Sequence, residues 1–498
     1  MTTTTATGAT TATDVLIVGA GPTGLTLACT LARAGAAVRI IDKSREFHRS
    51  SRGKGLNQRS RELLHDLGAE AEAAASGTEH ITLRKYRDGV AVSDTVTFGD
   101  RVPTPDTPYA SGLLMPQWRT EEILRGRLAA YGVEPETGCE LAEFSQSADG
   151  VVATLADGRR IEAAYLVGCD GGRSPVRKAL GVAFEGRTDA EECMVIGDVR
   201  ADGLDPAYWH QWFDEDAAVM LCPFRGSTHW QLQGAPERDA AGRPLAPSLE
   251  SFQRLLDRCS RQAGIRLSDP TWFSAYRINV RMADRFRAGR VFLAGDAAHV
   301  HSIAGGLGMN TGIQDAFNLG WKLAYVVRGL AAPGLLDTYE EERLPVAAWT
   351  LGLTEERLRS VLEGVKQAGV GTEAALTDDV TTLGVGYGWS SLAWGGTNAG
   401  ERAPDAPCRD GRLFDVFAGP HFTLLGFGGA SAQALAEAGE KCGDRLRTHL
   451  VDDSEGHARR AYGIDEGLVL VRPDNHIALS AGADRGAEIA ERLLRLGR

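Results

Sequence analysis

The sequence lacks the cysteine patterns that signal a disulfide framework or a metal site. Its eight cysteines are scattered singly, and none forms a CxxC pair or stands in a Cys/His group with zinc-ligand spacing. We therefore expect no bound metal and no redox dithiol. Scattered cysteines of this kind are typical of a reduced, cytoplasmic protein.

Two further absences argue against membrane insertion and nucleic-acid binding. No apolar run is long enough to span a bilayer, and residues 1–13 lack the basic and apolar regions of a signal peptide. We expect that segment to be a disordered tail. With 54 basic and 66 acidic residues, the formal net charge of −12 disfavours nucleic acid or an anionic membrane as the main partner. The expected protein is a cytoplasmic monomer or homodimer.

What the sequence does contain is an ordinary globular composition, 43% hydrophobic and 24% charged, in 498 residues. A chain of this length is too long for one hydrophobic core, so we expect two to four domains.

The strongest local motif lies near the N-terminus. The apolar strand 14–18 runs into GAGPTG at positions 19–24, a helix follows, and a second apolar strand ends at Asp42. In this context Gly19 permits a tight turn, Gly21 lets the backbone approach a pyrophosphate, and Gly24 allows close strand–helix packing. Asp42 can accept hydrogen bonds from ribose hydroxyls. The pattern predicts a dinucleotide site rather than a structural turn.

A second motif, residues 290–324, has the sequence RVFLAGDAAHVHSIAGGLGMNTGIQDAFNLGWKLA. A buried strand ends at Gly295 and Asp296, a loop of small residues follows, and an amphipathic helix begins. Free N–H groups and the helix dipole at such a helix start favour an anionic or hydroxyl-rich ligand. Alone, this could belong to any α/β protein. Together with the distant glycine turn it requires one long ligand, and FAD has that shape.

Weaker signals surround these two motifs. Residues 165–174 form another strand that ends in an acid and glycines, with Asp170 as a third contact to an extended nucleotide. Arg52 is a candidate for a position near phosphates or a flavin, with a solvated loop as the alternative. Gln117 could reach a flavin's ribityl chain, although an exposed loop glutamine is equally consistent with its position. We expect Thr120 to cap the helix that follows Gln117.

The segment 186–275 has a different character. Nucleotide signals vanish there, and aromatic residues are frequent, at Trp209, Trp212, Phe213, Phe224 and Trp230. Taken singly, each is best explained as a core residue. As a group they predict a strand-rich domain that covers a ring-shaped substrate.

Together the motifs resemble those of the class A FAD-dependent aromatic hydroxylases, which have the para-hydroxybenzoate hydroxylase-like fold. The closest resemblance is to the aromatic polyketide hydroxylases of actinomycete antibiotic biosynthesis, and it covers essentially the whole chain. It implies an α/β protein: a Rossmann-like FAD-binding domain, an inserted strand-rich substrate domain and a C-terminal thioredoxin-like domain without a redox dithiol. The implied FAD-binding domain is discontinuous and consists of residues 14–185 and 276–395. The substrate domain spans residues 186–275, with strands near 78–112 contributing to it, and the C-terminal domain spans residues 396–498.

The resemblance also implies the chemistry. FAD is bound non-covalently, NADPH or NADH reduces it transiently, and O2 then gives a flavin C4a-hydroperoxide that hydroxylates a polycyclic aromatic polyketide. The implied cofactor-binding residues are Gly19, Gly21, Pro22, Thr23, Gly24, Asp42, Lys43, Arg52, Gln117, Leu141, Asp170, Asp296, Gly308, Met309 and Asn310. The expected substrate-contacting residues are Trp212, Met220, Phe224, Trp230 and Ile303. No catalytic residue can be named, and His299 and His301 are interpreted as structural.

One departure from the family pattern concerns the glycine loop. Family members usually carry proline before the glycine pair and glutamine after it, where this chain has Ile303 and Leu307. We hypothesise that these two residues retune the flavin face without abolishing FAD binding.

Three alternatives to hydroxylation stay open: Baeyer–Villiger insertion, epoxidation and oxidative ring rearrangement. A non-enzymatic flavin-binding accessory protein is a weaker alternative. A flavin halogenase is disfavoured, because residues 209–212 (WHQW) lack the spacing of that group's tryptophan motif.

Overall fold

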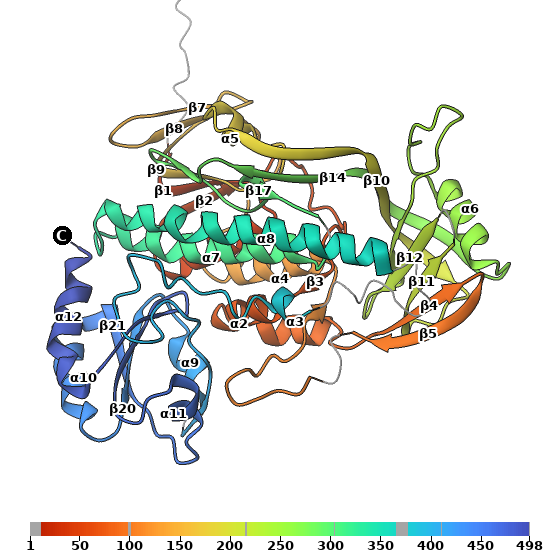
Figure 1. The fold of residues 1–498 in the computed structure, drawn as a ribbon. Helices are drawn as coiled ribbons and strands as arrows, with labels where there is room; N and C mark the ends of the chain where they lie inside the picture. The colour runs from red at the N-terminus through yellow and green to blue at the C-terminus, as the bar shows by residue number, and fades with distance from the viewer. Residues whose placement is uncertain are drawn as a thin grey trace, which may run out of the picture.

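The apolar strands of the glycine-turn motif form the centre of a sheet in the computed structural model (Figure 1). The order β2–β1–β9–β16 is parallel, β15 pairs antiparallel with β16, and β7 and β8 extend from β9 as an antiparallel meander. The strands are β1 (Thr11–Val18), β2 (Val38–Ile41), β7 (Leu141–Gln146), β8 (Val151–Leu155), β9 (Arg160–Gly168), β15 (Arg287–Ala288) and β16 (Val291–Leu293). Because the central strands are parallel, their carboxyl ends lie at one edge of the sheet.

The structure describes residues 11–97, 101–214, 217–302, 304–364, 377–409 and 411–497. The tail that we expected to be disordered, residues 1–13, overlaps the first strand at its C-terminal end. Thr11, Ala12 and Thr13 already belong to β1, where they pair with Ile161, Glu162 and Ala163 of β9. The ladder with β9 extends the strand beyond the apolar residues from which its start was predicted.

Helices cover this sheet and continue across the middle of the molecule. The helix α1 packs against α4 and α7, and α7 and α8 run side by side in the ribbon view (Figure 1). Their bounds are α1 (Pro22–Arg33), α4 (Gln117–Ala129), α7 (Leu307–Val327) and α8 (Asp337–Gly364). The expected cap at Thr120 is wrong, because α4 begins at Gln117 and has Pro116 as its N-cap, so Thr120 lies inside the first turn.

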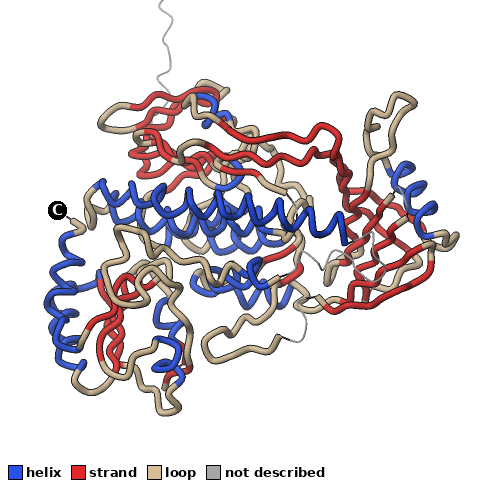
Figure 2. The backbone as a smooth tube through the Cα atoms, viewed as in Figure 1, coloured by secondary structure: helices blue, strands red, loops and turns tan. Residues whose placement is uncertain are grey.

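A second sheet lies at the opposite end from the C-terminus (Figure 2). Its order is β17–β14–β10–β13–β12–β11–β4–β5, antiparallel except for the β11–β4 pair. The strands are β4 (Thr82–Arg87), β5 (Val90–Val96), β10 (Phe184–Asp202), β11 (Tyr208–Phe213), β12 (Ala218–Pro223), β13 (His229–Gly234), β14 (Arg266–Ala283) and β17 (His299–Val300). The long strands β10 and β14 connect this sheet to the first.

One face of the second sheet is closed by the helix α6 (Leu249–Ser260), whose Phe252, Leu255 and Leu256 join the core beneath it. The remaining small elements lie at the edges and between the sheets. They are β3 (Gly55–Leu56), β6 (Leu113–Leu114), α2 (Gln58–Asp66), α3 (Glu70–Ser76), α5 (Pro175–Ala179), β18 (Pro407–Cys408), β19 (Gly411–Arg412) and α9 (Leu413–Phe417). None of the helices in the described ranges combines the length and apolar composition needed to cross a membrane.

The C-terminal unit has the strand order β21–β20–β22–β23, in which β20 and β21 are parallel and the other pairs antiparallel. This is the thioredoxin-like topology, and all eight cysteines of the chain are free thiols. The elements are β20 (Phe422–Phe427), α10 (Ser431–Cys442), β21 (Leu446–Leu450), α11 (His457–Tyr462), β22 (Gly467–Val471), β23 (Ile477–Ala481) and α12 (Gly486–Arg495).

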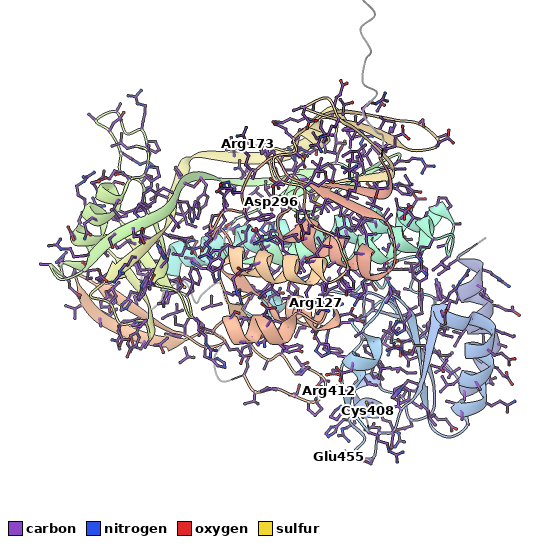
Figure 3. All side chains as sticks on the ribbon, turned by 180° about the vertical axis from the view of Figure 1, so that it is seen from behind. Arg127, Arg173, Asp296, Cys408, Arg412 and Glu455 are labelled. Atoms are coloured by element: carbon purple, nitrogen blue, oxygen red, sulfur yellow. The ribbon has the colours of Figure 1, made fainter. Side chains whose placement is uncertain are left out.

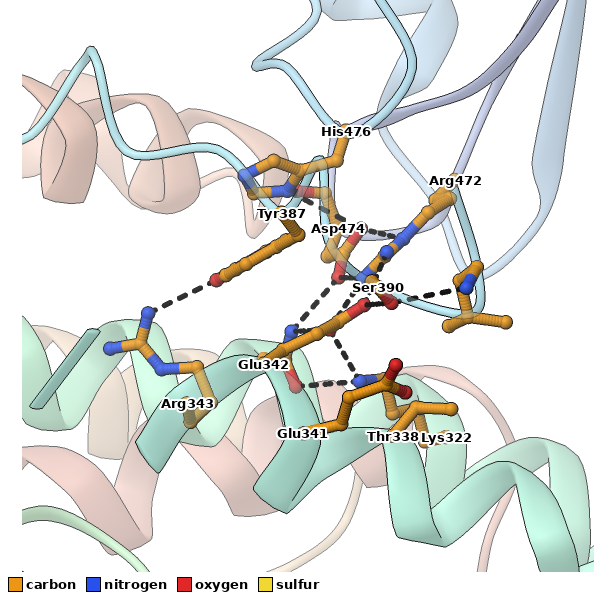
Figure 4. Close-up of polar contacts among 12 residues, drawn as sticks. Lys322, Thr338, Glu341, Glu342, Arg343, Tyr387, Ser390, Arg472, Asp474 and His476 are labelled. Carbon is orange, nitrogen blue, oxygen red and sulfur yellow. Dashed lines mark hydrogen bonds and ion pairs between the residues drawn. The ribbon is translucent and has the colours of Figure 1, made fainter. Parts of the chain in front are cut away.

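A buried ionic network joins this unit to the helices of the first domain (Figure 4). Glu342 of α8 accepts hydrogen bonds from Lys322 Nζ at 2.6 Å, from Arg472 Nη1 at 2.6 Å and Nη2 at 2.9 Å, and from the Ser390 hydroxyl at 2.6 Å. Arg472 also donates to Asp474. Burial alone raises the pKa of Glu342, but the charges of Arg472 and Lys322 outweigh it and hold that pKa well below its usual value. Two cations and two carboxylates therefore compensate one another inside the protein.

Replacing Arg472 by Met should destabilise the protein by about 3–5 kcal/mol, because it leaves two buried carboxylates facing a single cation. The first transition in urea unfolding, followed by tryptophan fluorescence, measures the loss. Arg485→Met is the control, since Arg485 pairs with Glu488 in solvent, and it should cost less than about 1 kcal/mol. Equal effects of the two substitutions would contradict this account.

Candidate active site

The glycine turn after β1 is shaped by contacts that leave no room for side chains. Gly19 has a φ of +108°, and a Cβ there would lie 2.3 Å from the Cys169 carbonyl oxygen. A Cβ on Gly24 would lie 2.0 Å from the Gly19 carbonyl oxygen. Gly21 differs, because its φ is −77° and nothing lies within 4 Å of its Cβ position. Gly19 and Gly24 thus serve the fold, whereas Gly21 keeps open space in front of the α1 N-terminus.

Asp42 is held at the end of β2 by backbone donors. Its Oδ2 accepts from the Ala20 N–H at 2.8 Å and its Oδ1 from the Ser44 N–H at 2.8 Å. These bonds link the acid to the glycine turn and fix the orientation of the carboxylate. The second lone pairs of both oxygens are available to a ribose.

Asp170 follows β9 next to the same turn. Its Oδ2 accepts from the Val176 N–H at 3.0 Å, while its buried Oδ1 has no hydrogen-bond partner within the protein. Burial raises the pKa of this carboxyl. A buried acceptor without a donor is uncommon in a folded protein and points to a ligand that supplies one.

The strand end at Asp296 is fixed from behind by Asp315 of α7. The Asp315 carboxylate is fully buried and accepts from the Gly295 N–H at 3.0 Å, His299 Nε2 at 2.6 Å and Arg343 Nε at 2.7 Å. Desolvation raises the pKa of Asp315, but the charges of His299 and Arg343 outweigh it and lower that pKa overall. This position gives His299 a structural role.

Asp296 itself faces the interior of the molecule, where Figure 3 shows it near the middle and Arg173 closer to the long strands. Its side chain is exposed and lines a large cavity. Desolvation by the surrounding protein raises the pKa of the Asp296 carboxyl. Electrostatic interactions with His299 and Arg52 partly oppose that effect. An acid in this setting favours a hydroxyl or another donor as its partner.

The glycine loop ends where α7 begins. Gly306 caps the helix in a left-handed conformation with a φ of 66°, and the first N–H groups of α7 have no acceptor within the helix. The Asn310 side chain accepts from the Asn57 N–H at 2.9 Å and donates to the Gly55 and Gly306 carbonyls. It thereby fixes the helix start against the segment after Arg52.

Gln117 is the first residue of α4 and faces that segment. Its Oε1 accepts from the Gly53 N–H at 3.0 Å, and its Nε2 donates to Glu121 at 2.8 Å. Burial raises the pKa of Glu121 to about 7, although the hydrogen bond from Gln117 opposes this. Arg52 lies nearby with its guanidinium 5.9 Å from the Trp272 ring centroid.

These groups surround one continuous cavity of about 2040 Å³. Typical ligand pockets measure roughly 300–1,000 Å³, so this cavity has room for a large cofactor and a second ligand. Of the fifteen residues implied as cofactor-binding, only Gly24 does not line it, because Gly24 packs behind the turn. The lining members are Gly19, Gly21, Pro22, Thr23, Asp42, Lys43, Arg52, Gln117, Leu141, Asp170, Asp296, Gly308, Met309 and Asn310.

The other end of the cavity is the inner face of the second sheet. Trp209 and Phe213 of β11, Met220 of β12 and Gln233 of β13 line it, together with Tyr276 of β14. Successive side chains of a strand point to opposite faces, so residues two or four apart share this face. Of the four expected substrate contacts that lie within the described ranges, only Met220 lines the cavity.

The expectation for Trp212 and Trp230 is corrected by the same alternation. Both point to the opposite face, into the core under α6, where Trp212 stacks on Tyr86 with ring centroids 4.8 Å apart. Phe224 is buried just beyond β12 and does not line the cavity. Local sequence does not decide which face of β11 points inward, because Trp209 and Phe213, four residues apart, are as aromatic as Trp212.

Ile303 lies outside the described residues. Leu307 lines the cavity and is also buried in a small cluster with Leu353 and Val380. Lys54 was missed altogether by the sequence analysis. It lines the cavity, and its Nζ reaches Gln231 and Gln233, which are far away in the sequence.

Comparison with known proteins agrees with this geometry. Residues 12–353 match the family described as FAD binding domain, and residues 396–496 match the family described as aromatic-ring hydroxylase, C-terminal. A flavin-dependent monooxygenase of Mycobacteroides abscessus is 42% identical, covering 97% of this chain and 99% of that protein. The 12-dehydrotetracycline 5-monooxygenase/anhydrotetracycline 6-monooxygenase of Streptomyces rimosus is 35% identical over 95% and 96%.

A solved structure shares the whole architecture. The ternary complex of aklavinone-11 hydroxylase with FAD and aklavinone superposes with a TM-score of 0.82 at 29% identity, covering 97% of this chain and 98% of that one. The chain therefore belongs to the FAD-dependent aromatic-ring hydroxylases of class A. More particularly, it is an FAD-dependent monooxygenase related to the polyketide hydroxylases of antibiotic biosynthesis, with NAD(P)H as the typical reductant.

The residues present fit FAD. Gly21 leaves space before a helix N-terminus for a pyrophosphate, Asp42 offers acceptors to a ribose, and Asp170 Oδ1 lacks a donor that a ligand would supply. The α7 N-terminus adds a second set of free N–H groups, and its first residues line the same cavity.

Replacing Gly21 by Ala should leave the fold intact and weaken FAD binding at least about tenfold, because the new methyl group would meet no protein atom but would occupy the cofactor's approach. The ratio of flavin to protein absorbance and a titration of the apoprotein measure this. Gly126→Ala, on the exposed face of α4, is the control and should retain FAD like the wild type. Full FAD retention by Gly21→Ala would refute the placement of the pyrophosphate.

Proposed function

We propose that this protein hydroxylates a polycyclic aromatic compound of the polyketide kind. The overall reaction consumes NAD(P)H, a proton, O2 and an aromatic C–H, and it yields NAD(P)+, water and a phenol. The observation that carries the proposal is that one cavity is lined both by the glycine turn and by the aromatic face of the second sheet. Relatives that act on tetracycline-type and anthracycline-type compounds support a substrate with several fused rings.

In this proposal each part of the chain has a defined task. The turn at Gly19, Gly21, Pro22 and Thr23 receives the pyrophosphate, and Asp42 binds the adenosine ribose. Leu141 lies beside the adenine. Lys43, Arg52, Gln117, Asp170 and Asp296 hold the middle of the cofactor. FAD bound there supplies two-electron transfer from the nicotinamide and activation of O2 for transfer to the ring.

The N–H groups at Gly308, Met309 and Asn310 are proposed to face the flavin ring system. A helix N-terminus stabilises negative charge that develops next to it, which favours the reduced cofactor. The second sheet then covers the substrate with Trp209, Phe213 and Met220 and excludes water from the reacting carbon. Leu307 is proposed to retune this region through its packing with Leu353, because a glutamine there would place an amide against apolar side chains.

The same proposal defines the domains. Segments 14–185 and 276–395 form the cofactor domain, the sheet within 186–275 with the strands near 78–112 forms the substrate domain, and 396–498 forms the C-terminal unit. The positions of β4 and β5 beside β11 support the assignment of the early strands. The division leaves β10, β14 and β17 shared between the first two domains.

The purified FAD-loaded protein should oxidise NADPH or NADH several-fold faster when a hydroxylated anthraquinone or tetracycline-type compound is added. Under labelled dioxygen, the product should gain one labelled oxygen atom and keep its ring count, as mass spectrometry will show. A product with an expanded or cleaved ring would replace hydroxylation by one of the other oxygenations. No stimulation by any compound of a broad phenol and quinone panel would contradict the enzymatic proposal.

A further inference from the structure

Lys54 is a half-buried cation whose ammonium group contacts two neutral amides and an aromatic ring. Its Nζ donates to Gln231 Oε1 at 2.8 Å and to Gln233 Oε1 at 3.1 Å, and it lies 4.1 Å from the centroid of the Trp209 ring. Both acceptors are neutral, and no described carboxylate forms an ion pair with the ammonium group. An ammonium group has three donors, so one remains for another partner.

The nearest acid does not compensate this charge by contact. Asp198 Oδ2 is engaged by the Ser51 N–H at 2.9 Å and by the Trp272 indole N–H at 2.5 Å. Burial lowers the pKa of Lys54 to about 8, and Cys222 and then Asp198 oppose that change only partly. The ammonium form therefore predominates at neutral pH but lacks a full counter-charge. A charge held away from bulk water is normally paired, so an unpaired ammonium group that lines this cavity suits an anionic group of a ligand.

The surroundings hold the Lys54 head group in place toward the cavity. Gln231 Nε2 donates to the Ser51 carbonyl oxygen, which fixes the amide orientation and turns Oε1 toward Lys54. Gln233 and Trp209, the other two contacts, both line the cavity, as does Lys54 itself. The two residues that flank Lys54 are anchored to cofactor-side elements. The Gly53 N–H donates to Gln117 Oε1, and the Gly55 carbonyl accepts from Asn310 Nδ2. The side chain thus extends from the cofactor side toward the substrate wall.

We propose that Lys54 binds an ionised phenolic or enolic oxygen of the substrate and so selects acidic hydroxyaromatic compounds. The inference rests on the proposed function and adds the chemical group that the substrate must carry. An anionic oxygen on the ring also raises the electron density of the adjacent and opposite ring carbons, which are the positions that an electrophilic oxygen attacks. Lys54 thereby fixes both the ionisation state and the orientation of the ring.

The test uses the FAD-loaded protein and alizarin, a dihydroxyanthraquinone whose hydroxyl group changes colour on ionisation. Anthraquinone, which has no hydroxyl group, is the neutral probe. Bound alizarin should show the spectrum of its anion at a pH at which free alizarin is largely neutral. In Lys54→Met this anion band should vanish and alizarin should bind about 10- to 100-fold more weakly, while anthraquinone binding changes less than about twofold.

Matched variants separate charge from packing. Lys54→Arg should restore most of the anion band, because the positive charge returns. Lys441→Met removes an exposed lysine from α10 and should behave as the wild type. Lys54→Gln provides a second uncharged variant if Lys54→Met loses FAD or unfolds early. Binding of neutral alizarin to the wild type, an unchanged anion band in both uncharged variants, or no alizarin binding would each overturn the proposal.

NAD(P)H oxidation in the same samples distinguishes this inference from the proposed function. Stimulated oxidation without preference for the anion would remove the role of Lys54 and leave the hydroxylase intact. Binding of the alizarin anion without stimulated oxidation by any member of the panel would support the anion site and contradict the enzymatic proposal.

Discussion

The site depends on one buried carboxylate more than on any residue that faces a ligand. Asp315 receives the Gly295 N–H, His299 and Arg343, and through them it ties the strand end, the loop and the helix α8 to α7. Without this acceptor, the Gly295 N–H and the Arg343 guanidinium would be buried without compensation. Asp296 and the α7 N-terminus therefore line the same cavity as the glycine turn, and Gly295 and Gly312 pack directly against Thr23 of that turn.

The cavity is a consequence of how two sheets of different character are joined. The parallel sheet presents strand ends and helix starts, which bind charged and hydroxylated groups, whereas the antiparallel sheet presents a side-chain face, which binds rings. The long strands β10 and β14 belong to the second sheet, pair with each other and extend toward the first (Figure 1). The C-terminal unit is joined to helix α8 by the Glu342–Arg472 contact, and neither residue lines the cavity.

Local sequence predicted the parts of this arrangement that depend on backbone conformation. The glycine turn, the strand-terminal acids Asp42 and Asp296, and the strand at Phe422–Phe427 all lie where their patterns indicate. Side-chain direction was harder to predict. Strand alternation gives two faces for β11, and only the position of α6 decides that Trp212 faces the core while Trp209 faces the cavity. Lys54 was not predictable, because its partners are 177 and 179 residues away.

The central claim is that cofactor and substrate share one cavity, with the cofactor's ring system between the α7 N-terminus and the inner face of β11 to β13. A crystal structure of the FAD-loaded protein tests it most directly. The account predicts pyrophosphate density at Gly21, the adenosine ribose at Asp42 and the isoalloxazine ring against Met309. FAD density elsewhere, or a ring system separated from Trp209 and Phe213 by a wall of protein, would contradict it.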